Sequence, residues 1–219
     1  MYWKRPFPWT QEGGLAMLSI RLVIIEDQYL VRDALARLMD KDADIEVVGT
    51  AEDGETGMAL IEQAHPDVAL IDIEIPVMDG ISVVQAVASK GLGTRAAILT
   101  TFGRPGYLER ALAAGAAGFL LKEQPVEVLI KQVRRLAQGE RVIDGELAAA
   151  AMVAGPNPLS NREREILRRV ADGETITTIA HALYLSHGTV RNYLSSALQK
   201  LEADNRAGAV REAERRGWI

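Results

Sequence analysis

The sequence predicts an α/β fold with a doubly wound, five-stranded parallel sheet, followed by a smaller all-α domain. Five short apolar runs lack polar alternation, which is typical of strands buried on both faces. A segment with apolar residues at helical spacing follows each run, and this favours alternating strands and helices. Only short amphipathic helices are indicated after the Gly-Pro-Asn-Pro cluster at 155–158, so a second domain begins there.

The elements follow in order along the chain. Strands are expected at residues 20–26, 45–51, 68–72, 96–101 and 118–122. Val31, Leu35 and Leu38 have the spacing of a helix after the first strand, and another helix is expected from about Pro105 to Gly115. In the second domain, helices are expected at residues 162–171, 176–183, 188–201 and 206–216.

These patterns divide the chain into four parts. We expect an irregular extension at 1–17, a sheet domain at 18–140, a linker at 141–158 and a four-helix domain at 159–219. The extension has no periodic pattern, and Met17 is an alternative start. No run approaches the ~18 uninterrupted apolar residues of a membrane span, so membrane insertion is not expected.

Composition and charge restrict the classes of function. The chain has no cysteine and three scattered histidines, which excludes a Cys-based zinc site and disfavours a His-based one; a reducing cytoplasm fits this composition. Residues 18–124 hold 9 Lys/Arg against 17 Asp/Glu, a net charge of −8, whereas residues 155–219 hold 10 against 8, a net charge of +2. The two domains are therefore expected to have different partners.

Acidic residues follow two of the predicted strands. Glu26 and Asp27 follow the first strand, and Asp72 follows the third, where Pro76 fixes a turn and Gly80 supplies backbone angles closed to other residues. Ligands of open α/β sheets bind at the carboxyl ends of the strands. The first, third and fourth strands are central in such a sheet, so these acids are expected to share one crevice.

Two further polar residues belong to the same crevice. Thr100 lies near the end of the fourth strand, and Lys122 ends the fifth. Clustered carboxylates repel one another unless a cation joins them, and oxygen ligands favour Mg²⁺. A carboxylate beside Mg²⁺ can attack a phosphoryl group. A solvated charge at a loop end is the alternative for each acid alone, but it is a weak explanation for the whole set.

The sheet domain resembles the receiver domain of response regulators. The resemblance rests on the Glu26-Asp27 pair, the Asp72-x-x-x-Pro76-x-x-x-Gly80 pattern, Thr100 and the Gly118–Lys122 ending. It implies that Asp72 accepts phosphate from a sensor histidine kinase, with Lys122 and Thr100 turned toward the phosphate.

The same resemblance implies a ligand set and a switch residue. Asp27 and Asp72 would bind Mg²⁺ directly, Glu26 through water and Glu74 through its backbone carbonyl. Phe119 stands where the family has a rotating aromatic, with a plain core residue as the alternative. Phosphorylation would promote a homodimer whose pairing face includes the helix from Pro105 to Gly115.

The helical domain shows a capping box and one helix with separate faces. Ser160 and Glu163 have the capping-box spacing. Ser186 can cap a helix on which Val190 and Leu194 face inward. Its outward residues are then His187, Arg191, Asn192, Ser195 and Gln199.

The whole chain resembles NarL/FixJ-family regulators with a LuxR-type helix-turn-helix. The motifs are Leu159-Ser160-x-Arg162-Glu163, Ile179-Ala180, Gly188–Tyr193, Lys200-Leu201-Glu202 and Asn205-Arg206. The resemblance implies a transcriptional regulator that binds a double-stranded operator with two half-sites.

The DNA contacts implied by this resemblance lie on one helix. Arg191 and Asn192 would read bases, Thr189 would contact a phosphate, and Ser195 is either a base contact or part of an ordinary polar face. The chain is also similar to DesR-type regulators, which control a fatty-acid desaturase. Tyr184 departs from the pattern because many relatives have Gly in this turn, and a left-handed conformation there would be costly.

Two alternatives stay open beside a phosphorylation-switched regulator. One is an aspartate-nucleophile phosphatase, but such enzymes usually carry a second Asp where this chain has Glu74, and their first strand carries the nucleophile. We therefore expect no enzyme. The other is a dimeric DNA-binding regulator that works without phosphorylation, which the intact acidic set argues against.

Overall fold

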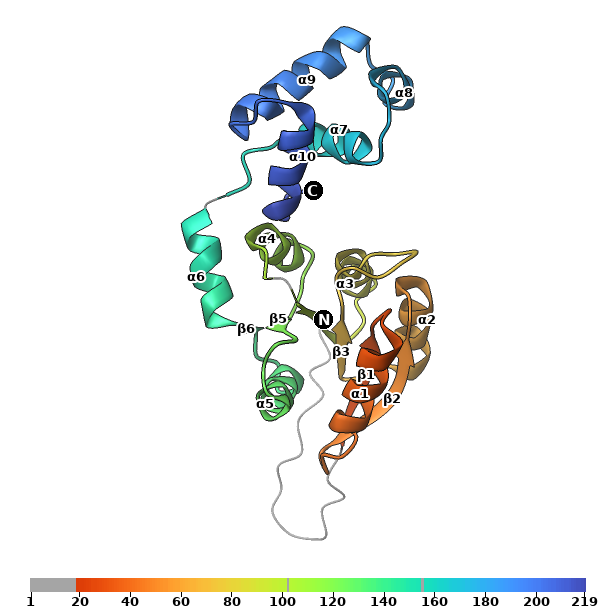
Figure 1. Cartoon of the computed structure of the whole chain (residues 1–219). Helices are drawn as coiled ribbons and strands as arrows, with labels where there is room; N and C mark the ends of the chain where they lie inside the picture. Colours follow the sequence, from red (N-terminus) through yellow and green to blue (C-terminus); the bar gives the residue numbers. More distant parts are fainter. Residues whose placement is uncertain (1–18, 102, 155) are drawn as a thin grey trace, which may run out of the picture.

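The computed structural model describes residues 19–101, 103–154 and 156–219 (Figure 1). It contains a sheet domain followed by a helical domain, as predicted from the sequence. The expected extension at 1–17 lies outside the described residues. Among the residues described, no helix is long and apolar enough to cross a membrane.

The sheet is parallel throughout, with strand order β2-β1-β3-β4-β5-β6. This order places β1, β3 and β4 in the centre, where apolar runs are buried on both faces. The strands are β1 (Ile20–Ile25), β2 (Ile45–Ala51), β3 (Val68–Ile71), β4 (Arg95–Thr100), β5 (Gly118–Leu121) and β6 (Val142–Ile143).

The sheet has six strands where five were expected, and the expected linker at 141–158 is largely structured. β6 adds to the edge of β5, and helix α6 (Gly145–Ala154) follows it. A strand of two residues is too short to show a period. The alanine-rich α6 has apolar residues on every side, so it shows no stripe from which a helix could be predicted.

Helices cover both faces of the sheet, which confirms the doubly wound class. Helices α2 (Gly54–Ala64), α3 (Gly80–Ser89) and α4 (Pro105–Ala113) bury apolar residues on one face. Helices α1 (Tyr29–Met39) and α5 (Val126–Ala137) do so on the other. α6 packs beside α4, and its Leu147 is buried in the same core.

The helical domain consists of four helices, as predicted. They are α7 (Asn161–Ala171), α8 (Ile176–Ala182), α9 (His187–Lys200) and α10 (Arg206–Arg215). Their buried faces form a separate core that includes Ile166, Leu194 and Trp218. The C-terminal end of α10 lies over α4, whereas α9 lies on the side of this domain that faces away from the sheet (Figure 1).

Candidate functional site

Five polar side chains lie at the carboxyl ends of four neighbouring strands. Glu26 and Asp27 follow β1, Asp72 follows β3, Thr100 ends β4 and Lys122 follows β5. Carboxylate oxygens of Glu26, Asp27 and Asp72 lie within 4.8 Å of one another. The strand order thus brings the acids together at one edge of the sheet, as the sequence led us to expect, and we call this cluster the acidic pocket.

Two of the three acids in this pocket, Glu26 and Asp72, share the ammonium group of Lys122. Lys122 Nζ lies 2.5 Å from Glu26 Oε2 and 3.1 Å from Asp72 Oδ2. Glu26 is 1% exposed and Asp72 is 7% exposed. Burial raises the pKa of both carboxyls, and Lys122 offsets only part of this increase. The pocket therefore carries excess negative charge that an added cation would stabilise.

The turn after Asp72 is tightly packed. The Ile73 N–H donates to Asp72 Oδ1 at 2.8 Å, and the Gly80 N–H donates to the Ile73 carbonyl at 3.0 Å. A Cβ on Gly80 would lie 2.0 Å from the Asp72 carbonyl oxygen, so a side chain has no room there.

The predicted reason for Gly80 is therefore wrong. Gly80 is the first residue of α3, and its backbone conformation is an ordinary one. A glycine is needed there because the folded turn leaves no space for a side chain. The residue with a left-handed backbone in this turn is Val77, with φ of 67°. A β-branched residue in that conformation is strained. This strain lies five residues after Asp72.

Three other predicted residues have defined positions around the pocket. Thr100 is buried at the end of β4. Phe119 on β5 is fully buried in the core that α2, α3 and α4 cover, so its side chain fills the core position named as the alternative. The Glu74 side chain is exposed and accepts a hydrogen bond from Tyr107 Oη at 3.4 Å. The switch role of Phe119 and the carbonyl role of Glu74 stay predictions.

Helix α9 has the two faces predicted from the sequence. Val190, Leu194 and Ala197 are buried, whereas Arg191, Asn192 and Ser195 are exposed. Ser186 caps the helix, because its Oγ accepts from the Thr189 N–H at 3.0 Å. The Thr189 hydroxyl pairs with the same Ser186 Oγ at 2.9 Å, so part of its polar capacity is used within the cap.

Glu163 is a buried polar residue whose main role the sequence did not reveal. Its carboxylate accepts from the Ser160 N–H at 2.6 Å, from Ser196 Oγ at 2.6 Å and from Lys200 Nζ at 2.8 Å. Burial raises its pKa, but the hydrogen bonds from Lys200, Ser196 and Ser160 outweigh this effect and lower the pKa to about 2.

This carboxylate joins α7 to α9 and so fixes the orientation of α9. The capping box with Ser160 was predicted and is present. The contacts with Ser196 and Lys200 span 33 and 37 residues, and a local motif contains no signal for them.

Tyr184 has the conformation that was expected to be costly. Its φ is 55° and its side chain is 94% exposed, in the turn between α8 and α9. The left-handed backbone at this position is confirmed.

Comparisons with known proteins match both parts of the chain. Residues 22–134 match the response regulator receiver domain, and residues 157–213 match the bacterial regulatory proteins of the luxR family. Over 200 residues the chain is 46% identical to the transcriptional regulatory protein YvfU of Bacillus subtilis (strain 168), covering 91% of this chain and 100% of YvfU.

Two more relatives cover most of the chain. It is 40% identical over 200 residues to the transcriptional regulatory protein DesR of Bacillus subtilis (strain 168), covering 91% of this chain and 99% of DesR. It is also similar to the crystal structure of the response regulator ChrA of a heme-sensing two-component system, with a TM-score of 0.57 and 36% identity. That likeness covers 92% of this chain and 100% of ChrA.

Proposed function

Because this chain belongs to the response regulators with a LuxR-type DNA-binding domain, we propose that phosphorylation of Asp72 switches its binding to DNA. Its relatives are transcriptional regulatory proteins, and it pairs a receiver domain with a helix-turn-helix domain. The acid cluster of Glu26, Asp27 and Asp72 beside Lys122 is the observation that carries the proposal.

Asp72 is proposed as the nucleophile. Its carboxylate oxygen forms a P–O bond as the P–N bond of a kinase phosphohistidine breaks, and the imidazole nitrogen keeps the electron pair. Lys122, now shared by Glu26 and Asp72, would pair with the phosphoryl oxygens, and the Thr100 hydroxyl would turn toward them. The Phe119 ring would rotate when the Thr100 hydroxyl turns, which is the switch role implied by the family resemblance.

The pocket residues fit a magnesium ion. Three carboxylates within 4.8 Å offer the hard oxygen donors that Mg²⁺ prefers, and no described His or Cys joins the cluster. Asp27 and Asp72 would bind the ion directly, Glu26 through water and Glu74 through its carbonyl. When bound, the ion would neutralise charge on the carboxylates and on the incoming phosphoryl group.

The DNA contact is proposed for the exposed face of α9. Arg191 and Asn192 would read base edges in the major groove, with Ser195 beside them and Thr189 on a phosphate. One reading helix gives limited specificity, so a dimer on two half-sites about 34 Å apart is expected. The partner kinase and the desaturase pathway implied by the DesR resemblance stay predictions.

The test is phosphoryl transfer from acetyl phosphate in the presence of Mg²⁺, followed by intact mass. The wild-type chain and the control Asp33→Asn, on the outer side of α1, should each gain one phosphoryl group. Asp72→Asn should gain none, because an amide is not a nucleophile. Equal labelling of Asp72→Asn would show that another residue is the phosphoacceptor. A wild-type chain that never gains the mass would favour the phosphorylation-independent regulator.

A further inference from the structure

The turn that joins β1 to α1 is bound by one arginine side chain. Arg32 Nη1 donates to the Glu26 carbonyl at 2.5 Å and to the Asp27 carbonyl at 3.3 Å. These carbonyls belong to the two acids that follow β1. The guanidinium therefore holds the main chain from which both carboxylates extend.

Arg32 is itself held in place by its neighbours. Its side chain is only 13% exposed, and its Nη2 lies 3.4 Å from Glu52 Oε2 in the turn after β2. Its guanidinium lies over the Tyr29 ring, 5.7 Å from the ring centroid. A planar guanidinium that is already oriented loses little further freedom when it binds carbonyls. The arginine thus acts as a fixed support for the turn.

Helix α1 lacks the usual side-chain cap at its start. Its N-cap residue, Gln28, makes no side-chain cap hydrogen bond, and its first turn contains no acidic residue. By contrast, the side chains of Asp53 and Asp79 cap α2 and α3. A capping side chain restrains the chain that enters a helix. At the start of α1, Arg32 supplies this restraint from within the helix.

The two acids differ in how far they depend on this restraint. The Glu26 carboxylate also lies 2.5 Å from Lys122 Nζ and accepts from the Gln28 N–H at 3.3 Å. The Asp27 side chain is exposed, and within the described part of the chain no hydrogen bond or ion pair holds its carboxylate. The direction of the Asp27 carboxylate therefore depends on its main chain, which Arg32 binds.

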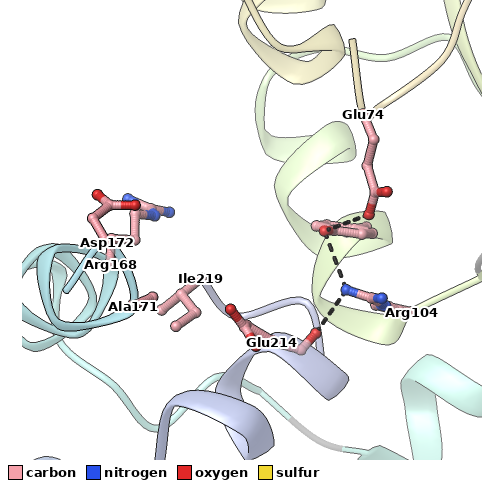
Figure 2. A pocket seen from close by; sticks show the side chains of 8 residues that line it. Glu74, Arg104, Arg168, Ala171, Asp172, Glu214 and Ile219 are labelled. Carbon is pink, nitrogen blue, oxygen red and sulfur yellow. Dashed lines mark hydrogen bonds between the residues drawn. The ribbon is translucent and has the colours of Figure 1, made fainter. Parts of the chain in front are cut away.

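A second arginine of the receiver has similar surroundings but different targets. Arg104 lies over the Tyr107 ring, 5.4 Å from its centroid, and its Nη1 donates to the Glu214 carbonyl at 3.0 Å (Figure 2). That carbonyl belongs to α10 in the helical domain. Stacking on a tyrosine and bonding to a carbonyl are thus not specific to the acidic pocket. Arg32 is distinguished by the carbonyls that it binds, which are those of two candidate metal ligands.

We propose that Arg32 is a positioning residue for Mg²⁺, because it directs the Asp27 carboxylate toward the acidic pocket. This inference rests on the proposed magnesium site at Glu26, Asp27 and Asp72. Removing a group that orients a metal ligand without touching the metal commonly weakens metal binding by about 10- to 100-fold. Without Arg32, phosphoryl transfer should need more Mg²⁺, whereas the reaction at saturating Mg²⁺ should be nearly unchanged.

The test is calorimetric titration of the full-length, unphosphorylated chain with magnesium chloride. Arg32→Ala should bind Mg²⁺ about tenfold more weakly than the wild type. Arg32→Lys should bind it about threefold more weakly, because an ammonium lacks the fork that reaches two carbonyls. Arg37→Ala is the matched control, since Arg37 lies on the same helix, is 75% exposed and pairs with Asp33. Its affinity should stay within about twofold of the wild type.

A second control separates the carbonyl bonds from the ion pair of Arg32. Glu52→Gln removes the charge that pairs with Arg32 Nη2 and leaves the donors to the Glu26 and Asp27 carbonyls. Its affinity for Mg²⁺ should also stay within about twofold of the wild type. A loss in Glu52→Gln as large as that in Arg32→Ala would assign the effect to the ion pair and overturn the positioning role.

Two further readouts separate positioning from a general loss of structure. In initial rates of phosphorylation by acetyl phosphate, Arg32→Ala should raise the half-saturating Mg²⁺ concentration about tenfold, with the rate at saturating Mg²⁺ within about twofold of the wild type. Methylguanidinium is small enough to enter the cavity of about 500 Å³ that Arg32 lines. It should restore part of the Mg²⁺ affinity of Arg32→Ala and leave the wild type unchanged.

The wild-type titration tells the two possible failures apart. Wild-type affinity in Arg32→Ala, or in Arg32→Lys if the alanine variant does not fold, would overturn the positioning role and leave the magnesium site standing. A lower rate at saturating Mg²⁺ with no change in the half-saturating concentration would overturn it too. A wild-type chain that binds no Mg²⁺ would contradict the proposed magnesium site and this inference together.

Discussion

Each domain contains one buried carboxylate–lysine group, and the two groups differ in charge balance. In the receiver, Glu26 and Asp72 share Lys122, and burial raises the pKa of both carboxyls. In the DNA-binding domain, Glu163 alone receives hydrogen bonds from Lys200, Ser196 and Ser160, and its pKa falls to about 2. The carboxylates are thus short of compensating positive charge in the receiver, whereas the carboxylate of the DNA-binding domain is fully hydrogen-bonded.

The difference separates a chemical role from a structural one. A carboxylate that is already satisfied is stable as it is, and adding a cation or a phosphoryl group would disrupt it. Carboxylates that are short of positive charge gain from an added cation, and these lie at the strand ends where ligands of open α/β sheets bind. Charge balance around each carboxylate therefore distinguishes the proposed site from a structural support.

The largest effect is expected from Glu163→Ala. It removes the carboxylate that joins α7 to α9 and leaves Lys200 and Ser196 without their acceptor, at a cost of about 3 kcal/mol to the DNA-binding domain. Glu165→Ala, whose partner is the partly exposed Arg162 three residues earlier, is the control and should cost less than about 0.5 kcal/mol. Urea unfolding of both variants checks this. Equal losses of unfolding free energy would show that the Glu163 cluster stabilises the domain no more than a surface ion pair does.

Acid should weaken the DNA-binding domain through the same residue. The folded pKa of Glu163, about 2, lies below the unfolded value of 4.5, so its stabilisation is present above pH 4.5 and is lost as pH falls toward 2. About 2 kcal/mol should be lost between pH 7 and pH 3. Glu163→Gln should flatten this dependence. If the variant unfolds in acid as steeply as the wild type, another group is responsible.

In the receiver, removing a buried carboxylate should not destabilise the domain as Glu163→Ala does in the DNA-binding domain. Glu26→Gln removes one of two carboxylates that share Lys122, so in chelator the stability should change by less than about 1 kcal/mol or increase. The same variant should bind Mg²⁺ more weakly, and Asp27→Ala more weakly still, since Asp27 is proposed as a direct ligand. Calorimetric titration checks the order. Equal affinity in the wild type and both variants would show that Mg²⁺ does not bind at this pocket.

The smallest effects concern backbone strain, which both domains contain. Val77 and Tyr184 have φ of 67° and 55°, and neither residue favours that region. Val77→Gly should stabilise the receiver by about 1 kcal/mol, and Tyr184→Gly should stabilise the DNA-binding domain by about 0.5 kcal/mol. Thermal unfolding of each variant measures this. Destabilisation by either substitution would show that the side-chain contacts of that residue outweigh its backbone strain.

Much of the fold follows from local patterns in the sequence. Apolar runs without alternation located β1 to β5, and the Ser160–Glu163 spacing located the start of α7. The pocket could be predicted because strand ends in a parallel sheet meet at one edge, so the positions of Glu26 and Asp72 in the chain imply their proximity.

The parts that could not be predicted depend on long-range contacts or lack a period. β6 and α6 carry no usable periodicity, so residues 141–158 suggested a linker. The Glu163–Lys200 pair and the Gly106–Arg216 bond join residues far apart in the chain, and no local motif encodes them. The role of Gly80 was misjudged because its steric limit comes from the Asp72 carbonyl, which only the folded turn brings close.

The most direct test of the account is the affinity for DNA with and without phosphate on Asp72. A fragment with two half-sites, selected from random DNA by the phosphorylated chain, is titrated by fluorescence anisotropy at fixed salt. Phosphorylated wild type should bind at least about tenfold more tightly than the unphosphorylated chain, and Asp72→Asn should show no gain from the donor. Equal affinity of the phosphorylated and unphosphorylated chains would contradict a phosphorylation-switched regulator.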